Sequence, residues 1–299
     1  MLATGGTIAS RVSQGGGLTP VLTGQVLLRF VPTLAQVCHV TVRDVCALDS
    51  TDLTTADRVR MAHVIWDARA DYDGFVVTHG TDTLAYTAAL LAHMLPDFDK
   101  PVLLTGSMYP IGAPDSDAEG NLLGAFRVAA SGRYTGVAAC VHGLILRGSR
   151  VVKIDSAAVA AFMSVGAPPD GSVDADGTVL IAQQPPRTRT PRLVEPRDTR
   201  VFVLRLTPDT DPAVFALLHG FDHVILESFG AGGIPARLED ALGALIAART
   251  RVYITTQCPF GGADLTKYAV GCRARARGAV DLGARTIEDS LAAIACGDL

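Results

Sequence analysis

The sequence has no excess of one charge and no long hydrophobic run. Its 299 residues include 26 basic and 30 acidic side chains, which give a net charge of −4. This balance excludes the electrostatic footprint of a protein that binds nucleic acid or an anionic membrane. No segment stays apolar over a full membrane span, and residues 1–6 lack the basic and apolar regions of a signal peptide. We therefore expect a cytoplasmic protein that acts on a small molecule, with no nucleic acid and no membrane as partner.

Paired cysteines and nucleotide-binding patterns are also missing. The six cysteines are scattered without a CxxC pair, and a chain with a large core does not need disulfide bonds. We expect buried thiols. The GxGxxG and Walker patterns are both absent, which argues against a phosphate-cradling loop and a dinucleotide-dependent dehydrogenase.

What the sequence does contain is a regular alternation of apolar and helix-length segments. Hydrophobic residues make up 48% of the chain, and this length usually divides into two domains. The predicted strands are residues 74–79, 101–106, 136–141, 201–206, 223–228 and 251–256, and residues 83–95 are a predicted helix. Continuous apolar strands that alternate with helices indicate a parallel sheet covered on both faces.

A proline-rich stretch suggests where the chain divides. Residues 185–191 contain three prolines, which suit an extended linker and cannot continue a helix or a central strand. The predicted fold class is α/β. It has a larger N-terminal parallel-sheet domain with helices on both faces (1–184), a linker (185–199) and a smaller C-terminal α/β domain (200–299).

Polar segments after predicted strands are candidate sites, because ligands of open parallel sheets bind beyond the carboxyl ends of strands. In Thr4-Gly5-Gly6-Thr7 the glycines let the backbone turn tightly and approach a substrate; a plain capped turn explains the segment too. In residues 78–83 (THGTDT) hydroxyls, a carboxylate and helix amides suit an ammonium group and an oxyanion. Capping by Thr81 or Asp82 is the alternative.

Two further segments carry candidate groups. In residues 49–52 (DSTD) the hydroxyls could bind a carboxylate or simply cap the helix that opens at residues 54–57. Lys153 follows two valines, and a lysine withdrawn from water beside a hydroxyl can accept its proton. A solvated surface lysine is the alternative for any lysine taken alone.

Taken together and in order, these segments resemble the L-asparaginase and glutaminase family. The resemblance rests on TGGTIAS, DSTD, DGFVVTHGTDTLAYTAALLAHML and RGSRVVK, and on ESFGAGGIP (227–235) and QCPFGG (257–262) for the smaller carboxyl-terminal domain. It spans nearly the whole chain. The residues around DSTDLT, THGTDTLAYTA and QCPFGG are closest to the cytoplasmic, type I branch.

The resemblance implies a hydrolase of asparagine metabolism that converts L-asparagine to L-aspartate and ammonia without a metal or organic cofactor. Thr7 matches the family's usual nucleophile, and Thr81, Asp82 and Lys153 match the second hydroxyl and its activating partners. In the implied mechanism Thr7 forms an acyl-enzyme and releases ammonia, and Thr81 and Lys153 then help water to release aspartate. The sequence leaves open which threonine attacks first.

The resemblance also implies substrate-binding positions and an assembly. Ser50, Thr51 and Asp82 match the groups that hold the substrate's carboxylate and ammonium, and Gly6 lies at the turn where the backbone approaches the substrate. The family's tendency to form homodimers or homotetramers implies a homo-oligomer here.

The sequence departs from the family in the loop of residues 10–20. The family's loop tyrosine is missing, and Leu18 occupies its place. Residues 15–17 are all glycine, so closing the loop costs more ordering entropy, which predicts weak affinity or an altered substrate. Where some members carry a glutamate in the carboxyl-terminal domain, this chain has Gly261 or Gly262, with Asp264 nearby.

The amino terminus and the substrate leave alternatives. Only three residues precede Thr4, where a central strand has about five, so we expect the true start to lie upstream. One alternative function is an amidase acting on glutamine or on the amide used by a tRNA-linked amidotransferase subunit. Another is a non-catalytic amino-acid-binding protein that lost the loop tyrosine.

Overall fold

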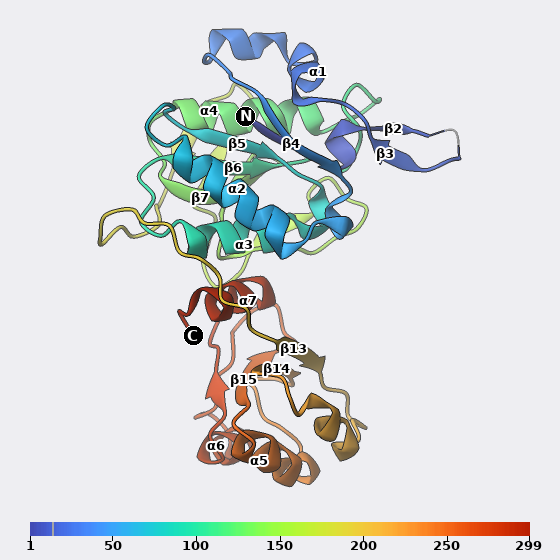
Figure 1. Cartoon of the computed structure of the whole chain (residues 1–299), viewed down its shortest axis with the longest axis vertical. Helices are drawn as coiled ribbons and strands as arrows, with labels where there is room; N and C mark the ends of the chain where they lie inside the picture. The colour runs from blue at the N-terminus through green and yellow to red at the C-terminus, as the bar shows by residue number, and fades with distance from the viewer. Residues whose placement is uncertain (14) are drawn as a thin grey trace. The chain divides into compact units, whose positions relative to one another are not determined.

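Apolar strands in the first two thirds of the chain pair into one eight-stranded sheet, in the order β12-β11-β8-β7-β6-β5-β1-β4. Figure 1 labels the strands β4 to β7 of this sheet. The structure is a computed structural model that describes residues 1–13 and 15–299. Gln14, in the loop predicted at residues 10–20, lies outside the described residues. The chain divides into two units, Met1–Pro196 and Arg197–Leu299, and residues 185–199 contain neither helix nor strand.

The first unit contains this sheet, two small hairpins and the helices that cover the sheet. The strands of the sheet are β1 (Leu2–Gly5), β4 (Arg43–Leu48), β5 (Phe75–Thr78), β6 (Pro101–Thr105), β7 (Gly136–Val141), β8 (Leu144–Arg147), β11 (Gly171–Val173) and β12 (Val179–Ile181). The hairpins are β2 (Ser10–Val12) with β3 (Leu18–Pro20), and β9 (Val151–Lys153) with β10 (Phe162–Ser164). The α-helices are α1 (Gly24–Arg29), α2 (Thr55–Asp67), α3 (Leu84–Met94) and α4 (Ala118–Ala130), and the 3-10 turns include η1 (Thr7–Ala9), η3 (Ser50–Asp52) and η4 (Thr81–Thr83).

The sheet is parallel from β4 to β7, which confirms the predicted core of the larger domain. Beyond β7 each of the strands β8, β11 and β12 is antiparallel to its neighbour, which differs from the predicted parallel sheet. The change of direction occurs at His142 and Gly143, whose φ angles of 47° and 70° are both positive. Two central residues with positive φ form the tight turn that suits a β-hairpin, so β8 returns beside β7.

Helices cover both faces of this sheet, as predicted. On one face Val76 of β5 and Leu103 of β6 belong to a core cluster with Leu122 of α4. On the other face the neighbouring residue Phe75 contacts Phe98, which in turn contacts Trp66 of α2. Successive side chains of a strand point to opposite faces, so residues 75–77 of β5 have to be apolar on both faces.

The second unit is a smaller α/β fold, also as predicted. Its parallel sheet has the order β13-β14-β15-β16. The elements are β13 (Val201–Arg205), β14 (His223–Ser228), β15 (Arg251–Thr256), β16 (Val280–Asp281), α5 (Glu239–Ala247), α6 (Ala269–Ala276) and α7 (Ile287–Cys296). Val224 of β14 packs with Leu242 of α5 on one face, and Ile225 packs with Ile294 of α7 on the other.

The cysteines only partly follow the prediction of buried thiols. Cys140 and Cys296 are buried and Cys38 and Cys46 half-buried, but Cys258 and Cys272 are exposed. The prediction was wrong for the last two. Cys258 lies in the turn after β15, and Cys272 lies on α6, which buries Gly271 and Ala274 instead. Among the described helices, none has both the length and the apolar character to cross a membrane.

Candidate active site

The carboxyl ends of three adjacent strands bring the predicted segments together. β1 lies between β4 and β5 and is parallel to both, with Gly5 opposite Leu48 and Ala3 opposite Thr78. All three strands therefore end at the same edge of the sheet. The segments that begin there contain Gly6 and Thr7, then Ser50 and Thr51, and then Thr81 and Asp82.

Two glycines let these segments approach each other at backbone distance. A Cβ placed on Gly6 would lie 2.3 Å from Gly80 Cα, and a Cβ placed on Gly80 would lie 2.7 Å from Ser50 Oγ. Gly6 also has a φ of +77°, which L side chains rarely adopt. The close packing of Gly6, Gly80 and Ser50 therefore depends on the absence of side chains at the two glycines.

Lys153 joins the second threonine to its neighbouring carboxylate. Its Nζ donates to Thr81 Oγ1 at 2.8 Å and to Asp82 Oδ1 at 2.6 Å. Thr81 is buried, and the Lys153 side chain is only 15% exposed. Because the ammonium group uses a lone pair of Thr81 Oγ1, the hydroxyl hydrogen has to point away from Nζ. Neither Thr81 nor Asp82 caps a helix, since η4 and α3 begin without a side-chain cap among the described residues.

Ser50 and Thr51 are placed by different contacts. Ser50 is buried, and its carbonyl accepts a hydrogen bond from Thr83 Oγ1 at 2.7 Å. Thr51 is exposed and donates from its backbone N and its Oγ1 to Asp49 Oδ1, at 2.9 and 2.7 Å. These bonds, the backbone one foremost, hold the pKa of Asp49 below its usual value. Thr54, not this segment, caps α2.

Thr7 presents a hydroxyl with no hydrogen-bond partner among the described residues. It opens η1, where Gly6 occupies the cap position and no side chain caps the turn. Ser10 Oγ donates to Gly6 O at 2.9 Å and closes the turn from the other side. Thr7 is partly exposed, so its hydroxyl is open to a ligand.

The hairpin that follows Thr7 carries Leu18 where the family has a tyrosine. Leu18 of β3 pairs with Val12 of β2, and these two side chains are 47% and 77% exposed. Two apolar side chains thus face solvent side by side. Leu18 supplies no hydroxyl to this edge of the sheet.

Several residues that hold the site are not among the predicted site residues, although two of them lie in the predicted segment 78–83. Thr83 links η4 to Ser50, and His79, Thr87 and Arg58 form a buried chain behind Gly80. Thr87 and Arg58 lie on α3 and α2, at positions that the helical pattern marks only as polar. Their relation to the site comes from the packing of these helices on β5, for which the sequence has no local signal.

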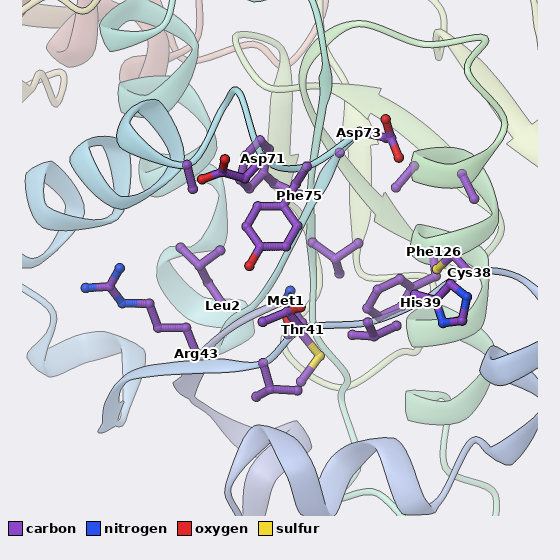
Figure 2. A pocket seen from close by; sticks show the side chains of 18 of the residues that line it. Met1, Leu2, Cys38, His39, Thr41, Arg43, Asp71, Asp73, Phe75 and Phe126 are labelled. Atoms are coloured by element: carbon purple, nitrogen blue, oxygen red, sulfur yellow. Dashed lines mark hydrogen bonds between the residues drawn. The ribbon is translucent and has the colours of Figure 1, made fainter.

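A separate cavity lies at the opposite ends of the same strands (Figure 2). It has a volume of about 1090 Å³ and is lined by Leu2, Arg43 and Phe75, which lie at the amino-terminal ends of β1, β4 and β5. Thr7, Thr81 and Lys153 are not among its lining residues. Open parallel sheets bind ligands at the carboxyl ends of strands, so this cavity is not the candidate active site.

The buried histidine makes stability depend on pH. Burial lowers the pKa of His79 to about 4, against the effect of its bond to Gly80 O and with a further lowering by the Arg58 charge. In the unfolded chain a histidine titrates near 6.5. Between about pH 6.5 and 4 the unfolded state therefore binds more protons than the folded state, and stability falls as pH falls, by about 3 kcal/mol in total.

Urea unfolding at pH 7 and pH 4.5 measures this loss. The His79→Gln variant is the control, because it lacks the titrating ring. We expect the variant to lose less stability than the native chain between the two pH values. An equal loss in both would show that His79 is not responsible.

Fold and site define an α/β protein with hydroxyl, lysine and carboxylate groups at the carboxyl edge of its larger sheet. Residues 1–187 match the family model "Asparaginase, N-terminal", and residues 200–296 match "Glutaminase/Asparaginase C-terminal domain". The chain therefore belongs to the asparaginase and glutaminase family, which confirms the resemblance found in the sequence. Among the described residues no cluster of three or more His, Cys, Asp or Glu could hold a metal ion.

The named relatives include an L-asparaginase and a component of a tRNA-linked amidotransferase. The chain is 38% identical over 295 residues to an L-asparaginase of Thermococcus kodakarensis, covering 97% of this chain and 89% of that protein. The solved structure of the thermostable L-asparaginase from that organism matches with a TM-score of 0.89 at 37% identity, over 98% of this chain and 90% of the other. The chain is also 30% identical to a glutamyl-tRNA(Gln) amidotransferase component of Methanopyrus kandleri, covering 94% of this chain but 66% of that protein.

Proposed function

We propose that the chain is an L-asparaginase that converts L-asparagine to L-aspartate and ammonia. The observation that carries the proposal is the contact of Lys153 Nζ with both Thr81 Oγ1 and Asp82 Oδ1, at 2.8 and 2.6 Å. A hydroxyl held by a lysine beside a carboxylate suits the orientation of water against an acyl-enzyme and the stabilisation of the negative charge that develops there. Similarity to a named L-asparaginase over nearly the full chain supports the same reaction.

In the proposed reaction Thr7 Oγ attacks the side-chain amide carbon of the substrate. The C–N bond breaks, and the nitrogen leaves as ammonia after taking the proton that the Thr7 hydroxyl gives up, so that an ester joins Thr7 to an aspartyl group. Water, oriented by Thr81, then attacks the ester carbon. Its proton passes to Thr7 Oγ as the ester bond breaks, and the Lys153 ammonium stabilises the negative charge that develops beside Thr81.

The substrate would be held at both ends by the segments after β4 and β5. The Asp82 side chain is 59% exposed and binds Lys153 through Oδ1, which leaves Oδ2 for the substrate's ammonium group. The Ser50 hydroxyl would bind its carboxylate, and the Thr51 hydroxyl would join it by turning away from Asp49 Oδ1, to which it donates at 2.7 Å without substrate. Gly6, packed on Gly80, leaves the turn of Thr7 without a side chain that would block the approach.

The first test is ammonia release from asparagine and from glutamine by the purified chain. Thr7→Ala is expected to lower kcat for asparagine by about 10²–10⁴-fold. Mass spectrometry of the Thr81→Val variant mixed with asparagine should find the added aspartyl mass on the peptide that contains Thr7. Its presence on another peptide would refute the assignment of Thr7 as nucleophile.

Two outcomes would favour the alternative functions. Faster turnover of glutamine would favour a glutamine amidase, and the likeness to the amidotransferase component gives that alternative its support. Binding of asparagine without ammonia release would favour a non-catalytic binding protein, for which Leu18 in place of the family's tyrosine is the supporting feature.

The expected homodimer or homotetramer is tested by sedimentation of the purified protein. The expected cytoplasmic location is tested by cell fractionation.

A further inference from the structure

A buried hydrogen-bonded chain runs from α2 to the backbone of the candidate site, and the proposed reaction does not use it. His79 is fully buried, with Nδ1 2.7 Å from Gly80 O and Nε2 2.8 Å from Thr87 Oγ1. Thr87 lies on α3 and is also fully buried. Arg58, on α2, donates from Nε to Thr87 Oγ1 at 3.0 Å.

Both ends of this chain fix the direction of its protons. Gly80 O can only accept, so Nδ1 of His79 has to carry the proton of the neutral ring. Nε2 is then an acceptor, and the Thr87 hydroxyl has to donate to it. Arg58 has only donors, and its Nε–H occupies a lone pair of Thr87 Oγ1. Each of the three hydrogen bonds from Arg58 to Gly80 therefore has one donor and one acceptor in a single arrangement.

This row of hydrogen bonds ends on the carbonyl of Gly80, in the peptide directly before Thr81. His79 N donates to Thr105 O at 2.8 Å, and a Cβ on Gly106 would lie 2.3 Å from His79 O. β6 and the residue that follows it thus hold the backbone of His79 on one side, while Gly6 and Ser50 hold Gly80 on the other. The His79 ring supplies the remaining constraint, because it fixes the orientation of the Gly80 carbonyl.

We propose that Arg58, Thr87 and His79 are positioning residues that orient the Gly80 peptide and thereby set Thr81 against Lys153. Their effect on turnover rests on the proposed function, whereas the proton arrangement of the His79 ring does not. Arg58 and Thr87 act only through His79 and do not touch the reacting groups. Loss of the hydrogen bonds from Arg58 to Gly80 should therefore lower kcat and leave KM nearly unchanged.

The test compares Thr87→Val, which keeps the shape but removes the hydroxyl, with Thr87→Ser, which keeps the hydroxyl. Thr87→Val is expected to lower kcat by about 10–100-fold, the scale of a small misplacement of a catalytic group, and Thr87→Ser to restore most of it. Thr250→Val is the matched control. It removes another buried threonine hydroxyl, which donates to Phe221 O at 3.0 Å in the second unit, and should leave kcat unchanged.

Nitrogen-15 NMR of histidine-labelled protein provides a readout that does not depend on activity. The native chain should show His79 as the neutral ring protonated at Nδ1, assigned by its loss in His79→Gln. Arg58→Met, on the partly exposed α2 position, should shift the Nε2 resonance and lower kcat less than Thr87→Val does.

Three results would overturn the proposal. They are a proton on Nε2 in the native chain, an unchanged kcat in a folded Thr87→Val variant, and no change of the His79 resonances in Arg58→Met. If the native chain releases no ammonia from either amide, the proposed function fails. The NMR results would then still decide whether the hydrogen bonds from Arg58 to Gly80 form as proposed.

Discussion

Replacement of Thr81 by valine is expected to lower kcat for ammonia release from asparagine by about 10²–10⁴-fold. Valine keeps the shape of the side chain and removes only the Oγ1 that Lys153 Nζ contacts at 2.8 Å. Lys153 keeps its 2.6 Å contact with Asp82, so the surrounding structure should persist. Steady-state kinetics of ammonia release measure the effect, and thermal unfolding checks that the variant folds.

A double-mutant cycle separates a shared role from two independent ones. Lys153→Met should have an effect as large as Thr81→Val, and the double variant should be little worse than either single one, because the two residues act as a unit. Thr250→Val again serves as the control and should match the native chain. Effects that multiply in the double variant would mean that Thr81 and Lys153 act separately.

Gly6→Ala is expected to cost about 2–5 kcal/mol of stability and to abolish turnover. The added Cβ would lie 2.3 Å from Gly80 Cα and N, and overpacking of this kind costs about 1–3 kcal/mol. The φ of +77° adds about 1–2 kcal/mol for a residue with a side chain. Urea unfolding and ammonia release measure the two losses.

The Gly16→Ala variant measures the stability cost of a side chain at a positive φ by itself. Gly16 has a φ of +79° but no atom within 4 Å of an added Cβ, so only the cost of about 1–2 kcal/mol applies. The difference in stability loss between the Gly6→Ala and Gly16→Ala variants then measures how much the close contact of Gly6 with Gly80 costs an added side chain. Similar losses in both would show that this close approach is not what holds the turn.

The sequence was sufficient for the elements that carry the fold. β14 and β15 coincide with the predicted strands 223–228 and 251–256, and α3 lies within the predicted helix 83–95. These segments are predictable because each is apolar on both faces or has the helical period, which are local properties. The antiparallel edge was not predictable in this way, since it depends on two residues with positive φ at the turn after β7.

For the candidate site, the sequence marked the segments but not their contacts. The residues from Thr78 to Thr83 were recognised because they follow an apolar strand and precede a helix. Whether Thr81 and Asp82 cap that helix or meet Lys153 could not be decided, because Lys153 follows Asp82 by 71 residues. The exposed Cys258 and Cys272 show the same limit, since exposure depends on which side of a segment the rest of the chain covers.

The sequence by itself thus determined an α/β chain with polar turns after its strands and the family to which it belongs. Only the tertiary structure decided which turns meet. It inserts β1 between β4 and β5, out of chain order, and it packs Gly6 on Gly80 and Gly80 on Ser50. It also places Arg58 and Thr87 behind His79. These contacts join residues far apart in the chain, and long-range packing of helices on the sheet, not local propensity, fixes them.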